Sequence, residues 1–405
     1  MQLKNQTQSG KIVVGVDVHP DDFAAAAFQG TNAVNMQMQF QHTKRSCREW
    51  ENWLREYVLP LNGIIVMEAG SNSFELAAIA ERLGIKSVVL DSFTAGRIAK
   101  SVCKNDKKDA IKLARVYFSG LADDVWQPDE ITRIRREILS GYLQAVKDAT
   151  RCCNRIKAYL TGHRIRLAKG MHLRKKTTRK HIASSYNWSE DQLFLLKQML
   201  RDYDSASEKR VELHQHMGKT VLENPMMNRL MNLCGIRLIS AYAIMAVIGD
   251  INRFDNPRKL ASYLGFAPAV RQSGSTSHNF GVRGCGRRDV KAVLTQASYA
   301  ILKSKNESGK KIREWGVKIK MRKHLHVAIC AIARKLAVAV WYAMKGYLPD
   351  ILDAEAEIKR KLRKVSQELG SDYVKESMGF KTVKEFTEKY LHAILFYKHQ
   401  MKVSQ

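Results

Sequence analysis

The sequence predicts an α/β domain followed by a mostly helical body, and three observations lead to this prediction. Short β-branched runs alternate with helix-like segments through residues 1–125. Apolar residues then recur at spacings of three, four or seven in two long stretches, a pattern typical of packed helices. The 405 residues, 45% of them hydrophobic, suffice for about two to three folded domains.

The first domain, residues 1–125, contains five runs with strand character. They cover residues 11–18, 23–29, 34–40, 64–67 and 87–90. Helix-permissive stretches lie at residues 48–58 and 74–84, and a further helical pattern begins at Asp106. Three consecutive strands followed by β/α alternation resemble the ribonuclease-H-like fold.

Four carboxylates stand at the ends of these elements. Asp17 lies in the first strand and Glu68 ends the fourth, while Asp106 and Asp109 share the first turn of the helix that follows. Gathering four like charges is costly unless cations neutralise them, and Mg²⁺ prefers oxygen ligands. The set therefore predicts a site for two Mg²⁺ ions. Each of the four predicted acids also has an ordinary explanation as a turn or cap residue. Four other nearby acids are alternatives for the site: Asp21, Asp22, Glu75 and Asp91.

Residues 126–222 predict a long helical arm, because a heptad-like apolar pattern runs through residues 139–160 and a second periodic stretch through 190–221. The arm is expected to be an antiparallel coiled coil or a dimerisation element. Its connection, residues 164–180, carries eight basic side chains and no acid. They are expected to bind a phosphate backbone, and the alternative is that the connection is only a solvated loop. The eight basic residues are Arg164, Arg166, Lys169, Arg174, Lys175, Lys176, Arg179 and Lys180.

Residues 223–348 predict a third, mainly helical domain, and residues 349–405 a charged helical tail without assignable chemistry. Residues 233–249 resemble half of a helix-hairpin-helix, whose turn can hold a phosphate; a buried helix explains the apolar part equally well. A polar loop then holds four hydroxyls that chemistry alone cannot rank: Ser273, Ser275, Thr276 and Ser277. Basic side chains around this loop are expected to contact phosphates: Arg271, Arg283, Arg287, Arg288 and Lys291. The apolar helix at residues 326–344 is interpreted as a buried helix, too short and interrupted to cross a membrane.

The net charge of +29 indicates a nucleic-acid partner. Residues 1–120 hold 15 basic and 12 acidic side chains, so nearly all of the excess lies in the remaining chain. A polybasic membrane-surface protein is disfavoured, since no lipidation signal accompanies the charge. Seven cysteines without a C-x-x-C pair, and an N-terminus without an apolar signal region, favour the bacterial cytoplasm.

These motifs resemble a known family. GVDVH, VMEAG, KNDKKDA and VWQPDE, followed by the Arg and Asn-Arg-Ile of residues 151–156, are similar to the N-terminal half of the DEDD transposases. GDINRFDNPRKLASYLGFAPAVRQSG and RGCGRRDVKAVL are similar to their C-terminal domain. This is the one-hundred-and-ten family of bacterial insertion sequences, related to pilin-gene inversion recombinases.

The resemblance implies an RNA-guided DNA transposase with a RuvC-like domain. It implies catalytic roles for Asp17, Glu68, Asp106 and Asp109, and a serine nucleophile at Ser273 in the R-Q-S-G motif. The implied partners are donor and target DNA and a structured bridge RNA. A dimer that assembles into a tetramer on DNA, near the nucleoid, is also implied. One departure concerns the family's P-G-I-G turn, which reads CGIR here, with Arg237 in place of the second glycine.

Two other functions remain open from the residues. In a RuvC-like nuclease or junction resolvase, metal-activated water would cut the strand and Ser273 would be structural. In a non-catalytic nucleic-acid-binding protein, the first domain would be a scaffold. No nucleotide cofactor is expected, because the chain has neither a P-loop nor a Rossmann glycine pattern.

Overall fold

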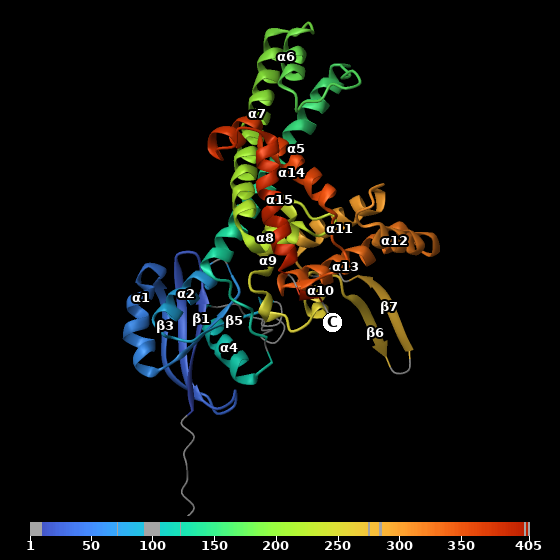
Figure 1. Ribbon diagram of the computed structural model, residues 1–405. Coiled ribbons are helices and arrows are strands. Elements are labelled where there is room, and N and C mark those ends of the chain that lie inside the picture. Colours follow the sequence, from blue (N-terminus) through green and yellow to red (C-terminus); the bar gives the residue numbers. More distant parts are fainter. Residues whose placement is uncertain are drawn as a thin grey trace, which may run out of the picture. The chain divides into compact units, whose positions relative to one another are not determined.

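The computed structural model describes residues 10–70, 72–92, 106–121, 123–273, 276–282, 286–400 and 402–403. The chain divides into two compact units, residues 1–128 and 129–405 (Figure 1). The first is an α/β unit, and the second is mostly helical.

The first unit is built on a mixed sheet of five strands in the order β3-β2-β1-β4-β5. Strands β1, β2 and β3 pair antiparallel, whereas β1, β4 and β5 pair parallel. This arrangement is consistent with the ribonuclease-H-like domain predicted above. The third strand begins later than expected, at Gln37 rather than near residue 34. The strands are β1 (Lys11–Val18), β2 (Asp22–Gly30), β3 (Gln37–Ser46), β4 (Ile64–Glu68) and β5 (Ser87–Leu90).

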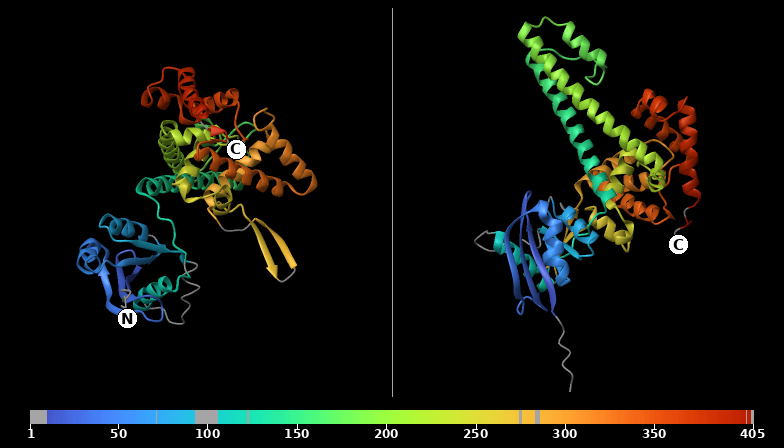
Figure 2. Two further views of the ribbon diagram at one scale, coloured as in Figure 1. Left: turned by 60° about the horizontal axis from the view of Figure 1, so that its bottom comes forward. Right: turned by 90° about the vertical axis from the view of Figure 1, so that its left-hand side faces the viewer.

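Helices cover both faces of this sheet (Figure 2). Helices α1 (Trp50–Trp53) and α2 (Ser73–Arg82) cover one face, where Val14, Val16, Ile65 and Met67 are buried with Trp50. Helix α4 (Asp106–Ser119) covers the other, where Val13 and Val66 pack against its alanines. Because alternate strand residues point to opposite faces, this division assigns each strand position to one helix layer.

The second unit begins with a long helical hairpin of α5 (Glu130–Gly162) and α7 (Glu190–Glu223), which lie side by side (Figures 1 and 2). Each helix has a side-chain N-cap. The Asp129 carboxylate accepts the Thr132 amide at 2.7 Å, and Ser189 forms a capping box with Gln192. The predicted pair of helices is therefore present, while its coiled-coil character stays a prediction.

The connection between these helices is partly folded, so it differs from the solvated loop that was the alternative interpretation. Helix α6 (Lys176–Ser184) follows a turn, and its Ile182 packs in a small core with Leu173 and with Ile156 and Leu196 of the hairpin. Apolar positions at 173 and 182 thus anchor the connection to the hairpin, because burying them removes apolar surface from water.

The remaining elements pack around one hydrophobic core that includes the tail. Two helices lie deep within it: α9, in which all but two residues are buried, and α13. The other elements surround them. They are α8 (Pro225–Met231), α9 (Leu238–Ile248), α10 (Pro257–Tyr263), β6 (Pro268–Ser273), β7 (Thr276–Val282), α11 (Arg288–Lys303), α12 (Lys310–Arg322), α13 (Leu325–Met344), β8 (Tyr347–Leu348), α14 (Glu355–Leu369), α15 (Val383–His399) and β9 (Lys402–Val403).

Helix α13 corrects the expectation that its length excludes a membrane span. An 18-residue window of this 20-residue helix has a mean hydropathy of 1.7, so length and composition alone would allow a crossing. However, its residues Ile332, Ala333, Leu336 and Val340 are fully buried in the hydrophobic core of the second unit. This packing identifies α13 as a core helix of the second unit.

The tail is joined to the turn before α9 by a buried lysine, which also forms an ion pair within the tail. The Lys361 ammonium of α14 donates to the carbonyls of Met231, Leu233 and Ile236 at 3.0, 2.7 and 2.7 Å. The Asp353 carboxylate lies 2.5 Å from the same nitrogen, and both side chains are at most 5% exposed. Three backbone acceptors and one counter-ion therefore depend on a single tail residue.

Replacing Lys361 by Met is expected to lower the free energy of unfolding by about 3–5 kcal/mol, since it leaves a buried carboxylate without its counter-ion. Lys359→Met is the matched control. Its exposed ion pair with Glu355 should contribute less than about 0.5 kcal/mol. Urea unfolding followed by circular dichroism measures both, and equal effects of the two substitutions would contradict the role of Lys361.

Candidate active site

Strands β1 and β4 bring Asp17 and Glu68 to neighbouring positions. The two strands are parallel and adjacent, with Val16 opposite Met67, so the next residue of each strand is one of the two acids. Asp17 is half-buried, with 20% of its side chain exposed, and Glu68 is exposed at the strand end. Adjacent carboxyl ends of parallel strands thus place two carboxylates at one edge of the sheet.

Both acids belong to the sheet face that α4 covers. They share the alternation of Val13 and Val66, which pack against that helix. Gly15 permits the close approach, because a Cβ there would lie 2.1 Å from the Ala110 carbonyl oxygen of α4. A residue with a side chain at position 15 would push the helix away from the strand that carries Asp17.

Helix α4 starts at Asp106, so both predicted helix acids fall in its first turn. Asp109 forms an ion pair with Lys112 on the same helix. The side chain of Asp106 lies outside the described part of the chain. The close contact of Gly15 with Ala110, the residue after Asp109, puts this part of α4 against β1 on the sheet face of Asp17 and Glu68.

His19 was not singled out from the sequence, yet its Nε2 atom lies 3.5 Å from the Asp17 carboxylate. The following backbone is tied to the turn after β4, since the Asn72 amide donates to the His19 and Pro20 carbonyls at 3.3 and 2.9 Å. The sequence signal that could have identified His19 is its position two residues after the candidate acid Asp17. The contact makes His19 part of the surroundings of Asp17.

An all-carboxylate donor set suits Mg²⁺, which takes oxygen ligands and retains open positions for phosphate oxygens. Asp17, Glu68 and Asp109 supply such donors on one side of the sheet. Among the side chains that the structure describes, which exclude Asp106, no three His, Cys, Asp or Glu residues form a ready metal cluster. The residues present fit a divalent cation in type, and the predicted four-acid site stays a prediction.

The segment predicted as a polar loop around Ser273 is a β-hairpin. Strands β6 and β7 pair antiparallel, with Ser273 opposite Thr276 and Gln272 opposite Ser277 (Figure 1). A Gly-Ser pair between two strand-like runs is a hairpin signal that the sequence interpretation missed. Ser273 ends β6, so its backbone sits at the turn; the side chains of Arg271 and Ser273 and all of Arg283 lie outside the described residues.

The predicted basic helix after the hairpin is α11. Arg287 precedes it and pairs with Asp289 at 2.8 Å, Arg288 is exposed, and Lys291 is half-buried. Arg136 of α5, also missed from the sequence, donates to the Ala246 and Val247 carbonyls at the end of α9. Arg136 and Arg287 line a polar cavity of about 240 Å³.

In the basic connection, seven of the eight predicted contact residues are exposed. Arg179 differs, because its guanidinium bonds Asp204 at 2.6 Å and donates to the Leu173 carbonyl at 2.6 Å. It also lies over the Tyr203 ring. These contacts show that Arg179 holds the connection to α7, whatever the other basic residues bind.

The turn predicted as half of a helix-hairpin-helix is bound by the tail. Gly235 takes a left-handed conformation with φ of 75°, and Arg237, which replaces the family's second glycine, bonds Glu368 of α14 at 3.0 Å. The Lys361 ammonium donates to the Leu233 and Ile236 carbonyls, so two carbonyls and one guanidinium of this turn are engaged within the chain. Phosphate binding by the turn stays a prediction.

Two segments of the chain match models of known protein families. Residues 14–165 match a DEDD transposase family model, and residues 227–306 match the model described as transposase IS116/IS110/IS902 family. The chain belongs to this family. The resemblance drawn from the motifs is thereby confirmed.

Several relatives agree with this assignment. A putative transposase, y4qE, of Sinorhizobium fredii is 26% identical over 57% of each chain, so this chain spans little more than half of that relative. The transposase for insertion sequence element IS1328 of Yersinia enterocolitica is 21% identical over 69% of this chain and 82% of its own. The pilin gene-inverting protein of Moraxella lacunata is 24% identical over 82% of this chain and 95% of its own.

The family segments contain the predicted catalytic residues but not every predicted feature. Asp17, Glu68, Asp106 and Asp109 lie in the first segment, and Ser273 in the second. Most of the basic connection falls between the segments, and helices α12 to α15 follow the second.

Proposed function

We propose that this protein is a DNA transposase of an insertion sequence that cuts and rejoins strands through a serine–phosphate link, guided by a structured RNA. The observation that carries the proposal is the pairing of Asp17 and Glu68 at the ends of adjacent parallel strands under α4. Carboxylates so placed are suited to metal-assisted phosphoryl chemistry, and membership of a transposase family supports DNA as the substrate.

Asp17, Glu68, Asp106 and Asp109 would hold divalent cations, for which Mg²⁺ is the best chemical match. When bound, such ions supply charge neutralisation at the scissile phosphate and at the leaving oxygen. The chain itself supplies the oxygen ligands and their spacing. The close contact between Gly15 and α4 supports a short separation between the helix acids and the strand acids.

Ser273 would be the nucleophile. Its hydroxyl oxygen attacks phosphorus, the bond from phosphorus to the leaving DNA oxygen breaks, and the serine proton passes to a base while the leaving oxygen gains one. The phosphoserine conserves the bond energy, so a second DNA hydroxyl can reverse the step and release Ser273 without ATP. Strand exchange therefore needs the partner strand to be present before the link is broken.

The proposed partners are donor DNA, target DNA and a bridge RNA, with the protein acting as a homo-oligomer in the bacterial cytoplasm. Support comes from the charge of +29 and from the exposed basic connection. A dimer that becomes a tetramer on DNA would let the acids of one protomer meet Ser273 of another, which would make cleavage conditional on assembly.

The test uses purified full-length protein, its element's flanking non-coding RNA, and labelled donor and target DNA. Strand-exchange products and a denaturation-resistant protein–DNA adduct on a suicide substrate, both dependent on Mg²⁺, are expected. Free ends without an adduct would instead support a nuclease or resolvase. Binding without Mg²⁺-dependent cleavage would support a non-catalytic binding protein.

Neutralising four exposed residues of the connection should weaken nucleic-acid binding and flatten its salt dependence. The log–log slope should fall by about 0.9 for each duplex phosphate that the variant no longer neutralises. Arg179 is left intact because it holds the connection in place. The four are Arg174, Lys175, Lys176 and Lys180.

The matched control neutralises four exposed lysines of the tail, which should change the slope much less: Lys375, Lys381, Lys384 and Lys389. Binding isotherms at several salt concentrations provide the slopes. Equal slopes for wild type and the connection variant would show that the connection faces only solvent.

A further inference from the structure

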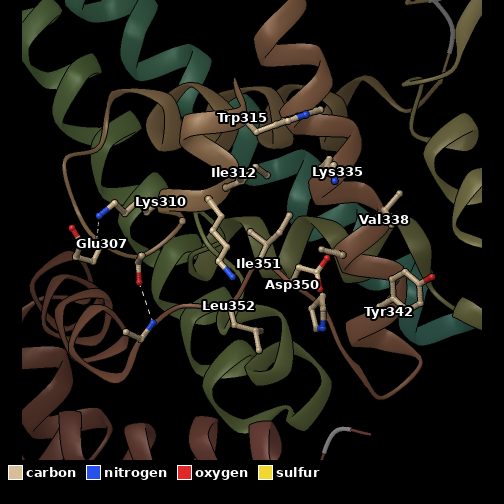
Figure 3. A pocket seen from close by; sticks show the side chains of 16 residues that line it. Glu307, Lys310, Ile312, Trp315, Lys335, Val338, Tyr342, Asp350, Ile351 and Leu352 are labelled. Carbon is tan, nitrogen blue, oxygen red and sulfur yellow. Dashed lines mark hydrogen bonds and ion pairs between the residues drawn. The ribbon is translucent and has the colours of Figure 1, made fainter. Parts of the chain in front are cut away.

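A cavity of about 920 Å³ lies beside helices α12 and α13 and the segment 349–354 (Figure 3). It falls beyond the second family segment, which ends at residue 306. Its volume is within the range of about 300–1,000 Å³ typical of sites for small organic groups. The cavity is therefore large enough for a nucleotide and is not explained by the catalytic residues.

The cavity exists because α12 packs closely on α13 at one point and leaves space beside it. A Cβ on Gly316 would lie 2.5 Å from Ile332 Cδ1, so a side chain at this position would require Ile332 to shift. The adjacent Trp315 is 36% exposed at the cavity rim. On the opposite side, the Ser308 hydroxyl accepts the Ala354 amide at 3.0 Å and joins the loop before α12 to the start of α14.

The lining combines aromatic rings with ammonium groups. Figure 3 shows Trp315, Lys335 and Tyr342 along one side of the cavity, and Lys335 Nζ lies 5.2 Å from the centroid of the Trp315 ring. Lys310 and Lys311 come from the first turn of α12. Stacking surfaces beside positive charges are the combination by which proteins hold unpaired bases and their phosphates.

Charge favours an anionic occupant. Helix α12 carries six basic residues and one acid in 13 positions, and most of its basic side chains are exposed. Of the two acids on the cavity wall, Glu307 is paired with Lys310 at 3.2 Å and Asp350 is exposed. An anionic ligand would supply negative charge to Lys310, Lys311 and Lys335, which a neutral apolar ligand would not.

We propose that this cavity binds an unpaired nucleotide of a single-stranded nucleic acid, its base against Trp315 and its phosphates on Lys310, Lys311 and Lys335. The inference rests on the proposed function and deepens it, by assigning a place for a strand that is not in a duplex. A base stacked in a duplex cannot enter, because its faces are already covered by its neighbours. The Tyr342 hydroxyl can donate to or accept from a base edge.

The experiment measures fluorescence anisotropy of the full-length protein with labelled 12-nucleotide RNA, DNA of the same sequence, and a duplex DNA. Trp315→Ala should weaken single-strand binding about 5- to 100-fold, with duplex affinity within about two-fold of wild type. Trp315→Phe should retain most of the affinity because a ring remains. Lys335→Gln should weaken binding and lower the salt slope, whereas Trp315→Ala should leave the slope unchanged.

Met321→Ala is the matched control, since Met321 is 80% exposed on the same helix but does not line the cavity. Circular dichroism establishes that each variant is folded. Wild-type single-strand affinity in both Trp315→Ala and Lys335→Gln, or an equal loss on the duplex, would overturn the inference. The RNA and DNA arms identify which strand is preferred, and the assay does not require recombination, so failure of strand exchange would count only against the proposed function.

Discussion

Replacing Asp17 by Asn is expected to abolish cleavage and strand exchange while leaving nucleic-acid affinity nearly unchanged. The substitution keeps the shape of the side chain but removes the charge that would hold a divalent cation at the end of β1. Losing one such ligand should cost several kcal/mol of transition-state stabilisation, which corresponds to about a thousand-fold or more in rate. Glu68→Gln should have the same effect, because Glu68 occupies the neighbouring position on β4.

Asp22→Asn is the control for these substitutions. Asp22 is a nearby acid whose carboxylate lies 3.6 Å from Lys44, and it stands at the start of β2 rather than beside Glu68. It should recombine DNA like wild type. Cleavage is measured with labelled donor DNA, and affinity is measured in parallel without Mg²⁺. Near-normal cleavage by Asp17→Asn would remove Asp17 from the site.

The adjacency of Asp17 and Glu68 could be predicted because it follows from local patterns. Two β-branched runs, each with an acid at or next to its last residue, predict strands, and parallel pairing brings their ends together. The same reasoning predicted the bounds of β1 and β5 correctly. It failed for the bounds of β3, an edge strand without a fully buried residue, so hydrophobicity left no clear mark of where it starts or ends.

Features that depend on distant partners could not be predicted. The hydrogen bonds from Lys361 to the carbonyls of residues 231–236 join segments more than 100 residues apart, and a lysine in a charged helix normally faces solvent. Likewise, the sequence does not distinguish Arg179 from its basic neighbours, because its partner Asp204 lies on a different helix. Charge runs predict a partner class well, but they do not separate binding residues from residues that hold the fold.

Chemistry and structure restrict the candidate nucleophiles to a few hydroxyl groups near Ser273 but do not identify one of them. Four hydroxyl residues fall within residues 273–277, and the strand register places Ser273 and Thr276 directly opposite each other. The R-Q-S-G motif selects Ser273 by family resemblance. Neither the register nor the intrinsic reactivity of a hydroxyl distinguishes the nucleophile, so substitution has to decide.

Ser273→Ala is expected to eliminate the covalent protein–DNA adduct and all strand exchange. The change removes one oxygen and leaves the backbone pairing of β6 and β7 in place, so DNA affinity should stay near the wild-type value. The measurement traps the adduct by denaturation on a nicked suicide substrate, with Mg²⁺ present. Ser275→Ala and Ser277→Ala are the controls, and both should retain the adduct, because each removes a neighbouring hydroxyl without touching the proposed nucleophile.

The outcomes separate the mechanisms because only one of them forms a bond between protein and DNA. An adduct that persists in Ser273→Ala would show that another hydroxyl attacks phosphorus, and loss in Ser277→Ala alone would name it. A wild-type protein that cuts with Mg²⁺ yet never forms an adduct would point to water as the nucleophile, which the acids of β1 and β4 could support without the hairpin. Loss of the adduct in Ser273→Ala together with its loss in Asp17→Asn would show that the hairpin and the sheet edge act on the same phosphate, although they belong to different units of the chain.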